Sequence, residues 1–136
     1  MSKIIQNAIR IIDKDLILIS RSTHDYCEVD GYMVDGGNDY QRYGHPDGME
    51  HNVENLTLYD TDDFDTIKNK LVWGTYGKDG KQKLKWIKLK DAEIEHLEAI
   101  NRQRKISDLR NQIINSIIED KQLMIRGKKI EKIINR

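Results

Sequence analysis

Arginines and aromatic residues in the second half of the chain have the chemistry needed to hold a nucleotide. Arg102, Arg104 and Arg110 lie at or beside the junction of two predicted helices. A guanidinium group pairs with phosphate through two parallel hydrogen bonds, and the free N–H groups at a helix start also favour anions. An aromatic ring from an earlier segment, such as Trp73 or Tyr76, could stack on the base. The simpler alternative is a solvated basic face.

A histidine–aspartate pair is the first candidate for catalysis. Asp25 follows His24 directly, and an aspartate beside a histidine can fix its tautomer and raise its basicity. Neighbouring side chains of a strand point to opposite faces, however, so the two would not hydrogen-bond each other in a strand. A structural or loop role is therefore the favoured interpretation of His24-Asp25-Tyr26.

Two glycine-containing segments could approach a phosphate group. Residues 34–40 join Asp35 and Asp39 to the double glycine Gly36-Gly37, which permits positive φ and close approach of a ligand. Residues 77–80 place a lysine between two glycines. Neither segment has the Walker spacing of a phosphate-binding loop. Both are predicted to be turns.

The sequence offers no complete set of metal ligands. Residues 60–63 form an acidic turn, but their order is not that of a Ca²⁺ loop. His45, His51 and His96 are scattered, and Cys27 is the only cysteine, so neither a cysteine-based zinc site nor an intramolecular disulfide is expected. We expect neither a metal nor a cofactor.

Length and composition predict one domain inside a reducing, cytoplasmic compartment. The chain has 136 residues, of which 38% are hydrophobic and 34% charged, and no apolar run approaches the ~20 residues that span a bilayer. Residues 1–68 hold 6 Lys and Arg against 14 Asp and Glu, whereas residues 69–136 hold 17 against 9. The basic half could face an anionic partner, or the two halves could attract each other or a second copy.

The pattern of apolar residues predicts an α+β fold with a β-rich region over residues 1–90. Residues 3–12 and 16–20 form one predicted hairpin, and residues 28–34 form a second around Asp30-Gly31. Residues 35–54 are predicted to be a loop region, followed by a strand at 56–59. A third hairpin joins residues 71–76 to 84–89, and Trp73 and Trp86 are expected near each other across it. About six strands should form an N-terminal antiparallel sheet.

Residues 91–136 are predicted to be a helical tail of two to three helices. Asp91 can cap a first helix, and Ser107 can cap a second whose isoleucines form a continuous stripe. Gly127 is expected to end this helix before a last short piece. The two stripes predict a homo-oligomer, because they offer more apolar surface than one small sheet covers. Their residues are Ile113, Ile114, Ile117 and Ile118, then Ile130, Ile133 and Ile134.

Residues 5–100 resemble a family of small bacteriophage proteins in five ordered segments. In many members of this family, cysteine pairs flank the histidine–aspartate–aromatic motif like a small metal ribbon. Here Ile11 and Lys14 stand in place of the first pair and Cys27 is alone, which puts a zinc site in doubt. The matching segments are 7–10, 20–26, 34–40, 73–82 and a last one formed by 89–91 and 96–97.

A sheet followed by two helices also resembles the phage Thoeris anti-defence sponge, which sequesters cyclic ADP-ribose signals without cleaving them. This resemblance implies at least two subunits, pockets where subunits meet, and arginine and aromatic contacts to the ligand. Arg21 and Arg110 are the positions we expect to bind it, with Arg102, Arg104, Trp73 and Tyr76 beside them. The resulting hypothesis is a phage-encoded binding protein rather than an enzyme.

Two alternatives remain open at the level of sequence. The basic half could bind nucleic acid through its phosphate backbone. A nucleotide hydrolase could use His24 together with Asp35 or Asp39.

Overall fold

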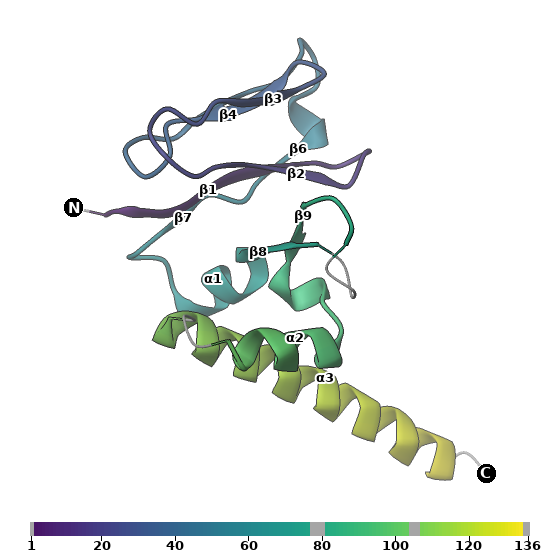
Figure 1. Ribbon diagram of the computed structural model, residues 1–136. Helices are drawn as coiled ribbons and strands as arrows, with labels where there is room; N and C mark the ends of the chain where they lie inside the picture. Colours follow the sequence, from purple (N-terminus) through teal and green to yellow (C-terminus); the bar gives the residue numbers. More distant parts are fainter. Residues whose placement is uncertain (1, 77–80, 104–106, 135–136) are drawn as a thin grey trace.

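The chain is stacked in layers, with two antiparallel sheets above a hairpin and a layer of helices (Figure 1). The computed structural model describes residues 2–76, 81–103 and 107–134, with side chains up to residue 127. These ranges contain nine strands, three α-helices and two 3₁₀ helices. The predicted α+β class is confirmed, although there are more strands than the six expected.

The central sheet is built on the first predicted hairpin, which is confirmed. Strand β1 (Ile4–Ile11) pairs antiparallel with β2 (Leu16–Ser20), and Ile9 lies opposite Leu18. The other edge of β1 pairs with β6 (Val53–Asn55) and with β7 (Leu58–Tyr59). The strand expected at 56–59 is therefore shorter than predicted and is preceded by β6.

The second sheet contains the second predicted hairpin, also confirmed, and a strand that was missed. β3 (Cys27–Val29) pairs with β4 (Tyr32–Asp35), which pairs with β5 (Arg42–Gly44). The prediction that residues 35–54 form a loop region is wrong, since β5, the 3₁₀ helix η1 (Glu50–Asn52) and the start of β6 lie there. β5 has no sequence signal because it has only three residues, and two of them are exposed.

A buried asparagine holds the double-glycine turn. Nδ2 of Asn7 in β1 donates to the carbonyl oxygens of Asp35, Gly37 and Tyr40 at 2.9, 3.0 and 3.0 Å. Gly36 and Gly37 have φ of 102° and 52°, and a Cβ on Gly36 would lie 2.0 Å from the carbonyl oxygen of Tyr40. The segment is thus a tightly packed turn, as predicted.

The positions at which the resemblance places cysteine pairs have other roles here. Ile11 is fully buried and Cys27 is half-buried in one apolar cluster between the two sheets. Lys14 forms an ion pair with Asp30 at 3.0 Å.

The third hairpin consists of β8 (Val72–Thr75) and β9 (Lys85–Lys88), as predicted; its turn at 77–80 lies outside the described residues. Gly74 pairs with Trp86 and Trp73 with Ile87, so the two indoles emerge on opposite faces. Trp73 packs against the helical cluster, and Trp86 against the cluster containing Ala8 and Val72. The two tryptophans therefore do not share one face of the hairpin.

Two helix starts differ from the prediction. Helix α1 (Phe64–Lys70) was missed; Asp63 is its N-cap, and Oδ1 of Asp63 accepts a 2.7 Å hydrogen bond from the backbone N of Thr66. Helix α2 (Ile94–Asn101) starts after Glu93 and has no side-chain cap. Asp91 is not its cap, because it belongs to the 3₁₀ helix η2 (Leu89–Asp91).

The first isoleucine stripe of helix α3 (Asp108–Ile134) is covered by other elements of the same chain. Oγ of Ser107 accepts a 3.2 Å hydrogen bond from the backbone N of Arg110, which confirms the predicted start. Ile113, Ile114 and Ile117 are buried against α1 and α2. Gly127 does not end the helix, which continues through it. The distal half projects away from the body (Figure 1). No helix within the described ranges is long and apolar enough to cross a membrane.

A chain of charges links the central sheet to β9. Oε1 of Glu54 lies 2.5 Å from Nζ of the buried Lys88 and 3.3 Å from Nε of Arg10. Burial raises the pKa of Glu54, but hydrogen bonds and charge from Lys88 and Arg10 outweigh it, so the pKa lies below its ordinary value.

Acid should therefore weaken the fold partly through Glu54. A carboxylate whose pKa is lowered by folding stabilises the fold above its unfolded pKa of about 4.3, and this contribution is lost as the pH falls through the folded pKa. Urea unfolding at about pH 6 and about pH 3 gives the loss of free energy of unfolding on acidification. This loss should be smaller for Glu54→Gln than for the parent, by roughly 1 kcal/mol. An unchanged difference would show that Glu54 is not coupled to Lys88.

Candidate functional site

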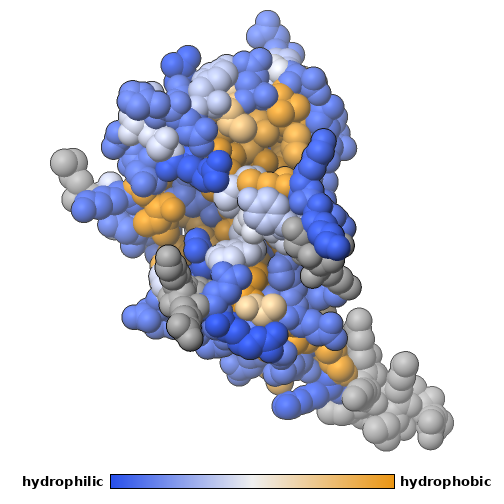
Figure 2. Space-filling model, in the orientation of Figure 1, coloured by the Kyte–Doolittle hydropathy of each residue, from blue (hydrophilic) through white to orange (hydrophobic). Residues whose placement is uncertain are grey.

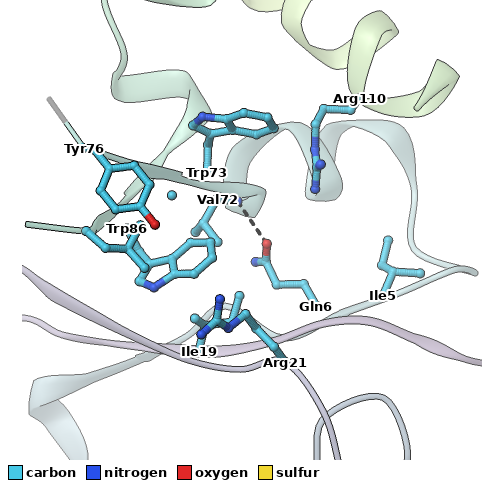
Figure 3. Close-up of a pocket in the computed structure, with 11 residues that line it drawn as sticks. Ile5, Gln6, Ile19, Arg21, Val72, Trp73, Tyr76, Trp86 and Arg110 are labelled. Carbon is cyan, nitrogen blue, oxygen red and sulfur yellow. Dashed lines mark hydrogen bonds between the residues drawn. The ribbon is translucent and has the colours of Figure 1, made fainter. Parts of the chain in front are cut away.

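A pocket of about 410 Å³ lies where the central sheet, the β8–β9 hairpin and the start of α3 meet (Figure 3). In Figure 2 the broadest apolar area lies at the level of the sheets and smaller ones lie between the sheets and the helical layer, while much of the visible outer surface is hydrophilic. The lining residues are Ile5, Gln6, Ile19, Arg21, Val72, Trp73, Gly74, Tyr76, Leu84, Trp86 and Arg110.

A buried glutamine fixes the back of the pocket. Nε2 of Gln6 donates to the carbonyl oxygens of Leu56 and Lys70, both at 2.8 Å, and its Oε1 accepts from the backbone N of Val72 at 2.9 Å. Gln6 thus ties β1 to β8 and to the end of α1. Because its amide is fully engaged in one orientation, this wall is rigid.

Arg110 forms the wall nearest the helices. Its guanidinium carbon lies 5.1 Å from the ring centroid of Trp73, within the range of a cation–π contact. Nε of Arg110 is buried and has no hydrogen-bond partner among the residues described. Burial lowers the pKa of Arg110, although the group stays charged. A partly desolvated cation with an unused donor is well suited to an anionic ligand.

Arg21 forms the opposite wall (Figure 3). Its guanidinium carbon lies 5.6 Å from the ring centroid of Trp86. Asp25 positions it: Oδ2 of Asp25 accepts from the backbone N of Arg21 at 2.8 Å and lies 3.9 Å from its Nε. The Arg21 side chain is 65% exposed, so it can move toward a ligand.

The structure brings together four of the six residues that were predicted to bind the ligand. Arg21, Trp73, Tyr76 and Arg110 line one pocket. Arg102 does not line it, since it is an exposed residue at the C-terminal end of α2. Arg104 lies outside the described residues.

Trp86 and Gln6 were missed as site residues. Trp86 was expected near Trp73 across the hairpin, but no sequence feature tied it to the arginines. Both indoles line the pocket, with Trp73 on one side of β8 and Trp86 on the other (Figure 3).

Comparison with protein-family models, curated proteins and solved structures finds no significant match.

The residues of the other motifs are engaged in local structure. Asp25 holds Arg21, and Oγ of Ser20 donates to the carbonyl oxygen of Asp25 at 2.6 Å. Asp39 accepts from Oγ1 of Thr23, and Oδ2 of Asp35 lies 3.8 Å from the guanidinium of Arg42. None of these residues lines the pocket except Arg21.

The carboxylates of the acidic turn likewise accept hydrogen bonds from the backbone. Asp60 accepts from the backbone N of Lys3 and Asp62 from that of Tyr59, both at 2.8 Å, while Asp63 caps α1. Over the described part of the chain, no three His, Cys, Asp or Glu side chains come together as a possible metal site.

Proposed function

We propose that the protein captures a cyclic nucleotide-like signal of the cyclic ADP-ribose type and holds it without cleaving it. The observation that carries the proposal is the pair of arginine–indole contacts on opposite walls of one pocket. Each contact offers a cation for phosphate beside a flat ring for a base. The volume is within the range of small-ligand sites.

The biological role rests on the resemblance to the phage sponge. A phage protein of this kind would act in the cytoplasm of the host cell and lower the concentration of an immune signal. The pocket fits a binding role, because its lining residues are arginines, one amide and apolar or aromatic groups.

The proposal is tested by titrating the protein calorimetrically with cyclic ADP-ribose isomers and recovering the ligand after denaturation. We expect binding and recovery of an unchanged ligand by mass spectrometry. A hydrolysed product would support the hydrolase alternative. Binding of DNA that weakens steeply with salt, without binding of the isomers, would support the nucleic-acid alternative.

We also propose that the protein is a homo-oligomer, now on different surface residues. Ile113, Ile114 and Ile117 of the first stripe are covered within the chain, and the side chains of the second stripe, Ile130, Ile133 and Ile134, lie outside the described residues. Leu123, Met124 and Ile125 on the projecting part of α3 are 54%, 64% and 47% exposed. Exposed apolar side chains on a projecting helix favour contact with a second copy. Light scattering at micromolar concentration should give more than one subunit, and a strict monomer would contradict this expectation.

A further inference from the structure

A glycine occupies the centre of the hairpin face that lines the pocket. Gly74 has no positive φ, so its backbone conformation does not call for glycine, and glycine weakens a strand interior. The reason lies in the space above it. A Cβ on Gly74 would lie 3.0 Å from Cδ1 of Leu84 and 3.1 and 3.2 Å from Cζ3 and Cη2 of Trp86.

The missing side chain lets the Trp86 indole lie directly over β8. Gly74 is the cross-strand partner of Trp86, and the benzo edge of the indole fills the volume that a Cβ would need. Arg21 contacts the same indole on the pocket side, and Figure 3 shows Trp86 between Tyr76 and Arg21. Any side chain at position 74 must push the indole away from β8.

We propose that Gly74 determines the ligand class of the pocket by keeping the Trp86 indole low enough for a planar base to stack between it and Arg21. This inference rests on the proposed function, and it assigns the base to Trp86. Arg21 contacts the Trp86 ring at 5.6 Å in the empty pocket, so it must move off the indole before it closes over the base. This movement is easy because its ion pair with Asp25 spans 3.9 Å and its side chain is 65% exposed. The ligand is then a nucleotide with an aromatic base rather than a sugar phosphate.

Valine at position 74 tests the proposal without removing a strand-forming residue. Valine favours strands, so Gly74→Val should keep the hairpin while displacing the indole. Gly74→Ala needs a shift of only a few tenths of an ångström and should have a smaller effect. Lys85→Val is the matched control, because exposed Lys85 pairs with Thr75 and does not line the pocket.

The experiment is calorimetric titration of the parent and three variants with cyclic ADP-ribose and with ribose 5-phosphate, which lacks the base. Since base–aromatic stacking is worth about 1–3 kcal/mol, Gly74→Val should weaken cyclic ADP-ribose binding about tenfold or more. Ribose 5-phosphate binding should change less than about twofold. Gly74→Ala should fall between, and Lys85→Val should match the parent.

A second measurement needs no ligand. The chain has two tryptophans, so Trp73→Phe leaves Trp86 as the only indole. In that background Gly74→Val should increase the quenching of Trp86 fluorescence by acrylamide, because the displaced indole is more exposed.

Three outcomes would overturn the inference. If Gly74→Val loses affinity for both compounds equally, the substitution has disrupted the whole pocket. If its affinity for cyclic ADP-ribose is unchanged, Gly74 does not determine the ligand class. These two results leave the proposed function intact, because the parent still binds. A parent protein that binds neither compound would overturn the proposed function and this inference together.

Discussion

Replacing Arg110 with alanine is expected to weaken binding of cyclic ADP-ribose isomers by about ten- to a hundredfold. The guanidinium lies on the pocket wall, partly desolvated, with Nε lacking a partner among described atoms. A charge-assisted hydrogen bond to phosphate is strong in such surroundings. The fold should change little, because losing the contact with Trp73 is offset by removing a desolvated charge; we expect a shift within about 1 kcal/mol. Calorimetric titration and thermal unfolding measure the two effects.

Two further variants make the Arg110 result specific. Arg110→Lys keeps the charge but not the planar pair of donors, so it should restore binding only in part. Arg102→Ala removes an exposed arginine that lies outside the pocket, and it should bind as the parent does. Unchanged affinity in Arg110→Ala, with a parent that binds, would show that Arg110 serves only to pack on Trp73.

Replacing Asn7 with alanine is expected to lower the free energy of unfolding by about 3 kcal/mol or more. The Asn7 side-chain amide is the shared donor for three carbonyl oxygens, and the residue is 1% exposed. Without it these acceptors lose a partner inside the protein, and the double-glycine turn loses its attachment to β1. Asn7→Asp keeps the shape but removes the donor, so it should be equally destabilising. Urea unfolding should show a lower midpoint for both variants.

Asn38→Ala is the control for Asn7, because Asn38 is an exposed residue of the same turn. It should change the free energy of unfolding by less than about 0.5 kcal/mol. If Asn7→Ala is as stable as Asn38→Ala, the three hydrogen bonds do not hold the turn.

The sequence predicted those elements whose apolar residues cluster or recur with a clear period. Strands β1 and β2 are rich in isoleucine and leucine on both sides of a polar break at residues 13–15, and α3 carries isoleucines at helical spacing from Ile113. Helix α1 was missed because it has seven residues and only Ile67 is buried. A single buried residue gives no period, so that helix depends on its packing against α3, where Nζ of Lys68 donates to Oγ of Ser116 at 2.8 Å.

The structure gathers four of the six predicted site residues in one pocket, for reasons that the sequence showed only in part. Arg110 was expected because it lies off the isoleucine stripe near a capped helix start, and both features hold in the structure. Arg102 was expected by proximity in the sequence alone, but the end of α2 leaves it away from the pocket. Trp86 could be added only when the packing of the hairpin on β2 was known.

The two arginines of the pocket come from different layers, Arg21 after β2 and Arg110 in the first turn of α3. A ligand that contacts both arginines connects two layers that are far apart in the sequence. It stabilises the closed arrangement by mass action, since it binds only when both walls are in place. Because Arg21 is largely exposed, such a ligand leaves when this side chain moves away, and its residence time depends on this local opening. Slow release would suit the proposed role of sequestering a signal.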